Sequence, residues 1–140
     1  MATNAQYVST PVIEITLINT ANTARDGTGT MGLVAAGPTS ASAAGVGKRI
    51  NRISVTANQT TTAGVVRFFG SLDSNATKRL VCEKLVPANT PSTSNPVVRF
   101  EVPELVGMVL PGTVGGLTAG LFASTNAGET FTVMVESGTL

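Results

Sequence analysis

The chain has 140 residues, of which 42% are hydrophobic, 12% charged and 4% aromatic, and its formal net charge is +1. This length fits one domain with one core. So few charges predict a surface of Ser, Thr, Asn and Gly, which favours association between chains, and the balanced charge argues against a nucleic-acid partner.

The residue types leave little catalytic chemistry. There is no histidine, which removes the commonest general base, the serine-type triads and most zinc sites. The eight carboxylates are scattered, so a glycosidase-like pair assembled in space is the remaining enzymatic alternative. We therefore expect no catalytic, cofactor-binding or metal site, and no enzyme.

The single cysteine, Cys82, excludes an internal disulfide. It lies in an apolar alternating run and is expected to be a buried small hydrophobe, with an intermolecular disulfide as the alternative. The N-terminus lacks the pattern of a signal peptide, and no apolar run approaches the roughly 18 residues of a membrane span. The chain is expected to be made in a cytoplasm, with no membrane partner.

Residues 1–11 are polar, end at Pro11 and predict an extended N-terminal arm, followed by a sandwich domain at 12–140. The first strand after the arm alternates. Its aliphatic side chains are expected to face the core: Ile13, Ile15 and Leu17. Glu14 and Thr16 are then expected to face outward.

Further strands are predicted by alternation at 30–36, 49–57, 61–72, 79–86, 97–102, 121–124 and 130–136. The connections at 19–29, 37–47 and 87–96 are rich in small residues or proline and are expected to be surface loops. About eight short strands without a helical period predict an all-β antiparallel sandwich, with the jelly roll as its natural eight-strand form.

The strand at 61–72 is expected to be central. One of its faces carries Val66, Phe68 and Leu72, and the other carries Val65, Arg67 and Phe69. Across the predicted strands, the residues expected to be buried are Phe68, Val55, Phe100 and Val133.

One motif resembles a dinucleotide fingerprint. Residues 27–32 read Gly-Thr-Gly-Thr-Met-Gly, but a strand follows them where the fingerprint needs a helix, and position 52 is Arg52 rather than an acid. The motif therefore predicts a glycine-rich turn that enters a strand.

Three stretches resemble small structural proteins of tailed bacteriophages. Residues 21–30 read ANTARDGTGT, residues 60–69 read TTTAGVVRFF after the Arg-Ile-Ser-Val of 52–55, and residues 121–131 read LFASTNAGETF. The resemblance implies a head decoration protein on the capsid surface of a virion, without enzymatic activity, whose partner is the major capsid protein.

Self-association is also expected, with a homotrimer as the first choice because it suits the three-fold points of an icosahedral shell. The candidate partner-binding residues are Tyr7, Pro11, Arg25 and Asp26. Arg25 and Asp26 form either a local ion pair that fixes the loop or a contact with a partner subunit. The functional alternatives are a tail, collar or head-fibre component, and a carbohydrate-binding sandwich, which the scarcity of aromatic residues disfavours.

Overall fold

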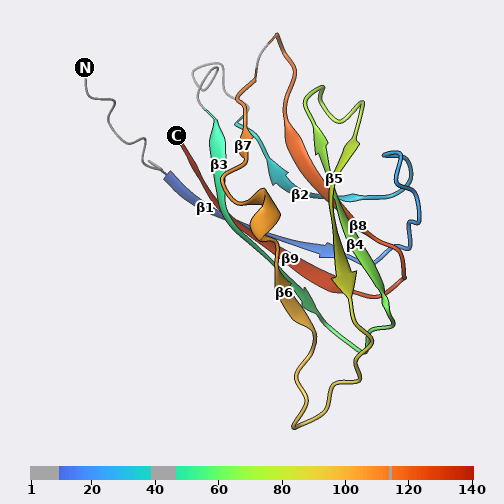
Figure 1. Ribbon diagram of the computed structural model, residues 1–140. Helices are drawn as coiled ribbons and strands as arrows, with labels where there is room; N and C mark the ends of the chain where they lie inside the picture. Colours follow the sequence, from blue (N-terminus) through green and yellow to red (C-terminus); the bar gives the residue numbers. More distant parts are fainter. Residues whose placement is uncertain (1–9, 39–46, 114) are drawn as a thin grey trace.

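The computed structural model describes residues 10–38, 47–113 and 115–140, and these consist almost entirely of strands and connections (Figure 1). The strands, in chain order, are β1 (Thr10–Ile18), β2 (Gly32–Ala36), β3 (Lys48–Ala57), β4 (Gly64–Ser71), β5 (Arg79–Val86), β6 (Arg99–Glu101), β7 (Val109–Leu110), β8 (Gly120–Thr125) and β9 (Phe131–Thr139). A 3-10 helix, η2 (Pro103–Leu105), lies between β6 and β7.

The strands form two antiparallel sheets. Sheet A has the order β1-β9-β3-β6, with β7 paired to the start of β3, and sheet B has the order β2-β8-β4-β5. Apart from the two-residue β7, the strands pair in a nested order. The first strand pairs with the last, β1 with β9, and each further pair lies inside the previous one in the sequence: β2 with β8, β3 with β6 and β4 with β5. This nested pairing is that of a jelly roll. The predicted antiparallel sandwich is confirmed, with β7 as a ninth, very short strand.

Sheet A follows the predicted alternation in its two central strands. On β3, Ile53 and Val55 are fully buried, and on β9 so are Val133 and Val135. Each pair lies directly opposite the other, Ile53 across from Val135 and Val55 across from Val133. Cross-strand contacts between β-branched side chains stabilise this centre of the sheet.

The orientation predicted for β1 is wrong. Ile13, Ile15 and Leu17 face solvent, with 64%, 66% and 59% of each residue exposed. The polar side of β1 faces inward because it finds partners there: the Glu14 carboxylate accepts hydrogen bonds from Lys48 Nζ at 2.6 Å and from the Ala36 N–H at 3.2 Å. Period-2 alternation separates the two faces of a strand but does not say which one meets the core.

β4 places two adjacent phenylalanines on opposite faces of sheet B. Phe68 points into the core, whereas Phe69 lies opposite Phe122 of β8, outside the main core cluster, and both are buried. Leu72 was expected inward but follows the end of the strand and is 66% exposed. A bulge between Phe68 and Phe69 shifts the pairing with β5, which leaves Leu80 partly exposed.

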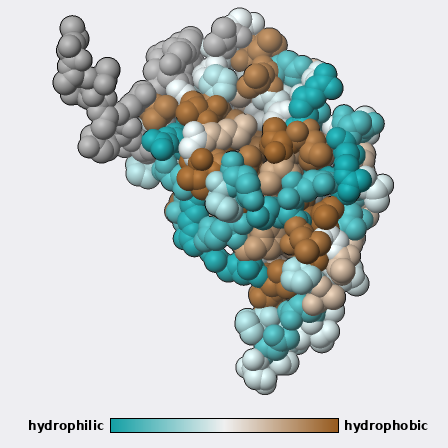
Figure 2. Space-filling view, in the orientation of Figure 1, coloured by the Kyte–Doolittle hydropathy of each residue, from teal (hydrophilic) through white to brown (hydrophobic). Residues whose placement is uncertain are grey.

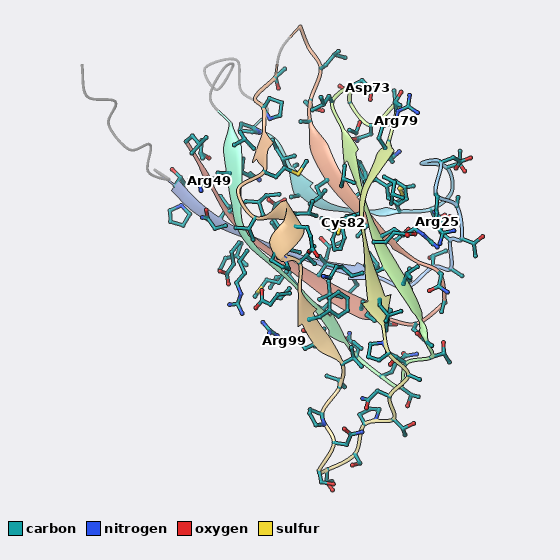
Figure 3. All side chains as sticks on the ribbon, viewed as in Figure 1. Arg25, Arg49, Asp73, Arg79, Cys82 and Arg99 are labelled. Atoms are coloured by element: carbon teal, nitrogen blue, oxygen red, sulfur yellow. The ribbon has the colours of Figure 1, made fainter. Side chains whose placement is uncertain are left out.

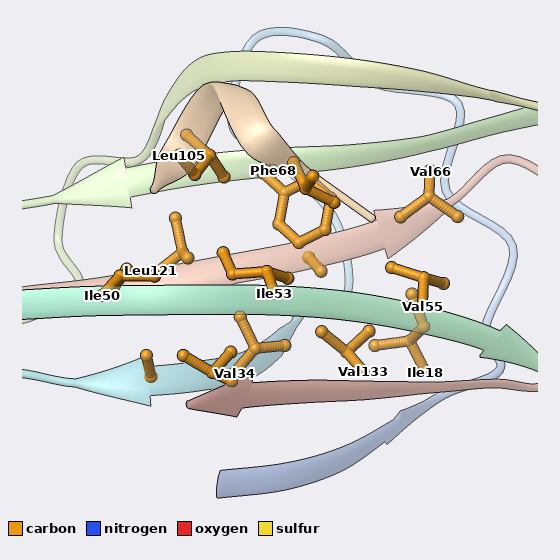
Figure 4. Close-up of a cluster of buried hydrophobic side chains, with 14 of the residues drawn as sticks. Ile18, Val34, Ile50, Ile53, Val55, Val66, Phe68, Leu105, Leu121 and Val133 are labelled. Carbon is orange, nitrogen blue, oxygen red and sulfur yellow. The ribbon is translucent and has the colours of Figure 1, made fainter. Parts of the chain in front are cut away.

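The main core fills the space between the sheets (Figure 4). Of the four residues predicted to be buried, Phe68, Val55 and Val133 have no exposed surface. Phe100 is half-buried and packs against the core from the edge strand β6. Cys82 is also half-buried against the core, and burial raises the pKa of its thiol, which favours the neutral form.

Candidate interaction surfaces

The first candidate surface is the row of aliphatic side chains on β1, here named the β1 ridge: Ile13, Ile15 and Leu17. β1 is an edge strand, and among the described residues it pairs with β9 alone. The one charge of β1, Glu14, points inward to Lys48, so the outward side of this edge strand presents the apolar side chains of the ridge.

The second candidate surface is a groove with a volume of about 390 Å³, here named the β5–β7 groove. It opens between β7 and the β4–β5 hairpin. The lining is mostly apolar and consists of Gly70, Ser71, Leu72, Asp73, Thr77, Arg79, Val81, Met108, Val109 and Leu110. Figure 2 shows apolar side chains gathered on this part of the surface, where β7 and the start of β5 lie in Figure 1.

Two charged residues lie at the turn end of the groove, Asp73 and Arg79 (Figure 3). The Asp73 carboxylate accepts hydrogen bonds from the Thr77 N–H at 2.8 Å and from the Ser71 hydroxyl at 2.9 Å, and chiefly the bond from Thr77 holds its pKa below the usual range. Arg79 has no ion pair within the described ranges. The rim of the groove therefore offers an available cation.

The outer face of sheet A carries a neutral charge network beside the β1 ridge. Arg52 donates to Glu101, with Nε–Oε1 at 2.9 Å, and lies 3.7 Å from Glu136, while Arg99 lies 3.5 Å from Glu101. The hydrogen bond from Arg52 lowers the pKa of Glu101. Within this network two cations balance two anions, while Arg49 of β3, exposed on the same face, has no ion pair in the described part of the chain and adds one positive charge.

The outer face of sheet B is covered by the connection 19–31. The buried guanidinium of Arg67 donates from Nε to Glu83 at 2.7 Å and from Nη1 to the Asn22 carbonyl at 3.1 Å. Arg25 reaches the same Glu83 oxygen at 2.7 Å. The two arginines lower the pKa of the Glu83 carboxylate, chiefly through the hydrogen bond from Arg67. One carboxylate thus fastens the connection to the sheet.

The glycines of the connection fit it against its neighbours. Gly27 and Gly29 have φ of +89° and +85°, a conformation that favours glycine. A Cβ on Gly27 would lie 2.0 Å from the Lys78 carbonyl oxygen, and one on Gly29 would lie within 3 Å of the Asn22 side chain. The predicted glycine-rich turn that enters a strand is confirmed, because β2 begins at Gly32.

The predicted partner-binding residues fall in three places. Tyr7 lies outside the described residues. Pro11 lies within β1, opposite Gly138, because the strand begins at Thr10, two residues before the expected start of the sandwich domain. Arg25 pairs with the distant Glu83, and the Asp26 carboxylate accepts hydrogen bonds from the backbone N–H and the hydroxyl of Thr28. These two residues therefore do not form the expected local ion pair with each other. Their role toward a partner stays a prediction.

Sequence reasoning missed both apolar surfaces. The alternation of β1 predicts the side chains of the β1 ridge in the core and not on the surface. The β5–β7 groove joins residues from segments far apart in the chain, so no local pattern predicts it. The sequence carries no local signal for the ridge, because Lys48, the partner that draws Glu14 inward, is 34 residues away in the chain.

The described residues offer few features of a catalytic or carbohydrate site. No group of three or more His, Cys, Asp or Glu that could hold a metal ion is found among them. The phenylalanines are buried, or half-buried in the case of Phe100, so the described surface has no exposed aromatic ring on which a sugar could stack. No helix in the described ranges is long and apolar enough to cross a membrane.

No protein-family model, curated protein or solved structure matches the chain.

Proposed function

We propose that this chain is a structural protein of a tailed-bacteriophage virion, a decoration protein that binds the shell of major capsid protein and stabilises the head. It acts mechanically and not as an enzyme. Each copy adds buried area across junctions between capsid subunits, and many copies turn a modest contact into a large collective one. The chain also associates with itself, as a trimer.

The observation that carries the proposal is where the phage-like stretches lie. They are far apart in sequence, yet 21–30, 60–69 and 121–131 meet on sheet B. β4 pairs with β8, the Asn22 N–H donates to the Thr125 carbonyl at 2.8 Å, and Arg67 of β4 donates to the Asn22 carbonyl. That the three stretches contact one another supports the proposal.

Two further observations support a role in assembly. The exterior carries few charges and a net charge of +1, so copies repel one another weakly. The β1 ridge and the β5–β7 groove expose aliphatic side chains in contiguous groups, which is typical of surfaces that contact other proteins. Jelly rolls also occur in viral capsid and lectin domains, which is an analogy of fold alone.

The test is to mix the purified full chain with heads that lack decoration and, separately, with isolated tails, and to count co-sedimenting copies. We expect saturable binding to heads and none to tails. Binding to tails instead would favour the tail, collar or fibre alternative. Binding to neither, together with retention on a glycan array, would favour the carbohydrate-binding alternative and overturn the proposal.

A further inference from the structure

The two apolar surfaces lie on opposite sides of the sandwich. The β1 ridge belongs to the edge of sheet A that lies beside β2, where the Thr16 hydroxyl donates to the Leu33 carbonyl at 3.2 Å. The β5–β7 groove lies beside β5, the other edge strand of sheet B. A two-fold dimer needs one self-complementary surface, whereas a head-to-tail assembly needs two different ones. Two different surfaces therefore favour the head-to-tail arrangement.

The ridge and the groove also match in form. Alternate residues of a strand are about 6.6–6.8 Å apart, so the three ridge side chains project in a row of roughly 13 Å. The groove volume of about 390 Å³ falls in the range of roughly 300–1,000 Å³ found for clefts that bury ligands. Gly70 keeps part of the groove open, because a Cβ there would contact Met108 and Val81 at 3.7 Å each.

The charges beside the two surfaces are complementary. Glu136 lies directly opposite Ile13 in the β1–β9 pairing, so its side chain is on the same outer face as the ridge. Its described ion pair, to Arg52, is 3.7 Å long, and Arg52 gives its hydrogen bonds to Glu101. Arg79 on the groove rim has no ion pair within the described ranges. The carboxylate of Glu136 thus accompanies the ridge, and the guanidinium of Arg79 accompanies the groove beside Asp73, whose carboxylate is already engaged by Thr77 and Ser71.

We infer that the β1 ridge of one copy packs into the β5–β7 groove of the next copy, and that the contact repeats until a ring of three closes. The ridge lies on the outer face of one sheet and the groove at the opposite edge of the sandwich, so successive copies turn relative to one another. This inference rests on the proposed self-association. It does not depend on the capsid shell, because the assembly is tested without heads.

The test uses three matched variants of the full chain, each of which replaces an exposed aliphatic side chain by Asp. Ile15→Asp charges the middle of the ridge, and Leu72→Asp charges the groove. Leu85→Asp is the control, because Leu85 is 75% exposed on β5 and belongs to neither surface. The molar mass of each is measured by sedimentation equilibrium over the micromolar range, and circular dichroism checks that each is folded.

The parent chain and Leu85→Asp are expected to be trimers, and Ile15→Asp and Leu72→Asp monomers. An equimolar mixture of the two monomeric variants retains one intact ridge and one intact groove, so it is expected to form a 1:1 dimer and no ring. If Leu72→Asp stays trimeric, or the mixture stays monomeric, the ridge-to-groove contact is overturned while self-association stands. If the parent chain is itself a monomer, both fail.

Discussion

Arg67 is a charged residue in the middle of a strand, and it is buried with 4% of its surface exposed. A buried guanidinium is stable only when it is paired and hydrogen-bonded. Glu83 and the Asn22 carbonyl supply those contacts, and Arg25 adds a second cation to Glu83 from the solvent side. Arg67 and Glu83 together therefore join the connection 19–31 to sheet B.

The first prediction concerns Glu83. Glu83→Gln removes the charge that compensates Arg67, and we expect a loss of about 1–3 kcal/mol in the free energy of unfolding at neutral pH. The folded state lowers the pKa of the Glu83 carboxylate. The stability that the charged carboxylate adds to the fold is therefore fully present above the ordinary carboxylate pKa of about 4.3, and it is lost as the pH falls through the lowered pKa of the folded state.

Urea unfolding of the parent and of Glu83→Gln, measured between neutral and strongly acidic pH, checks this sign. The two stability curves are expected to converge at acid pH. A difference that is constant across the whole pH range would show that Glu83 acts through its shape rather than its charge.

The second prediction concerns Phe68, which fills the centre of the main core (Figure 4). Phe68→Ala is expected to cost roughly 3–5 kcal/mol, the usual range for a buried phenylalanine. Phe100→Ala is the comparison, because Phe100 is half-buried at the edge of the same core and is expected to cost less. Equal losses in urea unfolding would contradict the placement of Phe68 at the centre.

At the scale of elements, the connection 19–31 acts as a cover for sheet B, and Gly27 packs against the backbone of Lys78, just before β5. We predict that Gly27→Ala destabilises the fold by about 1–3 kcal/mol more than Gly107→Ala, since overpacking adds to the backbone strain. Gly107 is the matched control: its φ of +90° is nearly that of Gly27, but nothing lies within 4 Å of its Cβ position. Chemical denaturation measures the free energy of unfolding of both variants. Equal losses would mean that the connection moves away from Lys78 at no cost when a Cβ is added.

Much of the fold could be predicted from alternation, and the failures have physical reasons. β3 and β9 are central strands with one apolar face each, so their inward residues were identifiable. β1 is an edge strand with an apolar face and a polar face, and the Lys48 that satisfies Glu14 comes from a strand distant in sequence. The groove could not be predicted at all, because its walls meet through tertiary packing.

At the scale of the whole molecule, the jelly roll leaves its apolar surfaces outside the core. Exposed aliphatic side chains grouped on one face are typical of surfaces that contact other proteins. Here the low net charge and the two apolar surfaces favour contacts between copies. This combination suits a protein that works in many copies on a larger assembly.

The measurement that tests the proposed function most directly is the heat resistance of phage heads titrated with the full chain. DNA release is followed with an intercalating dye, and bound copies are counted in parallel. A ligand that binds the intact form stabilises it. We therefore predict that the release temperature rises with the number of bound copies and levels off at saturation, and that Ile15→Asp, which cannot form the ring, gives a smaller rise at equal concentration. Saturating binding without any change in the release temperature, or no binding at all, would contradict the proposed function.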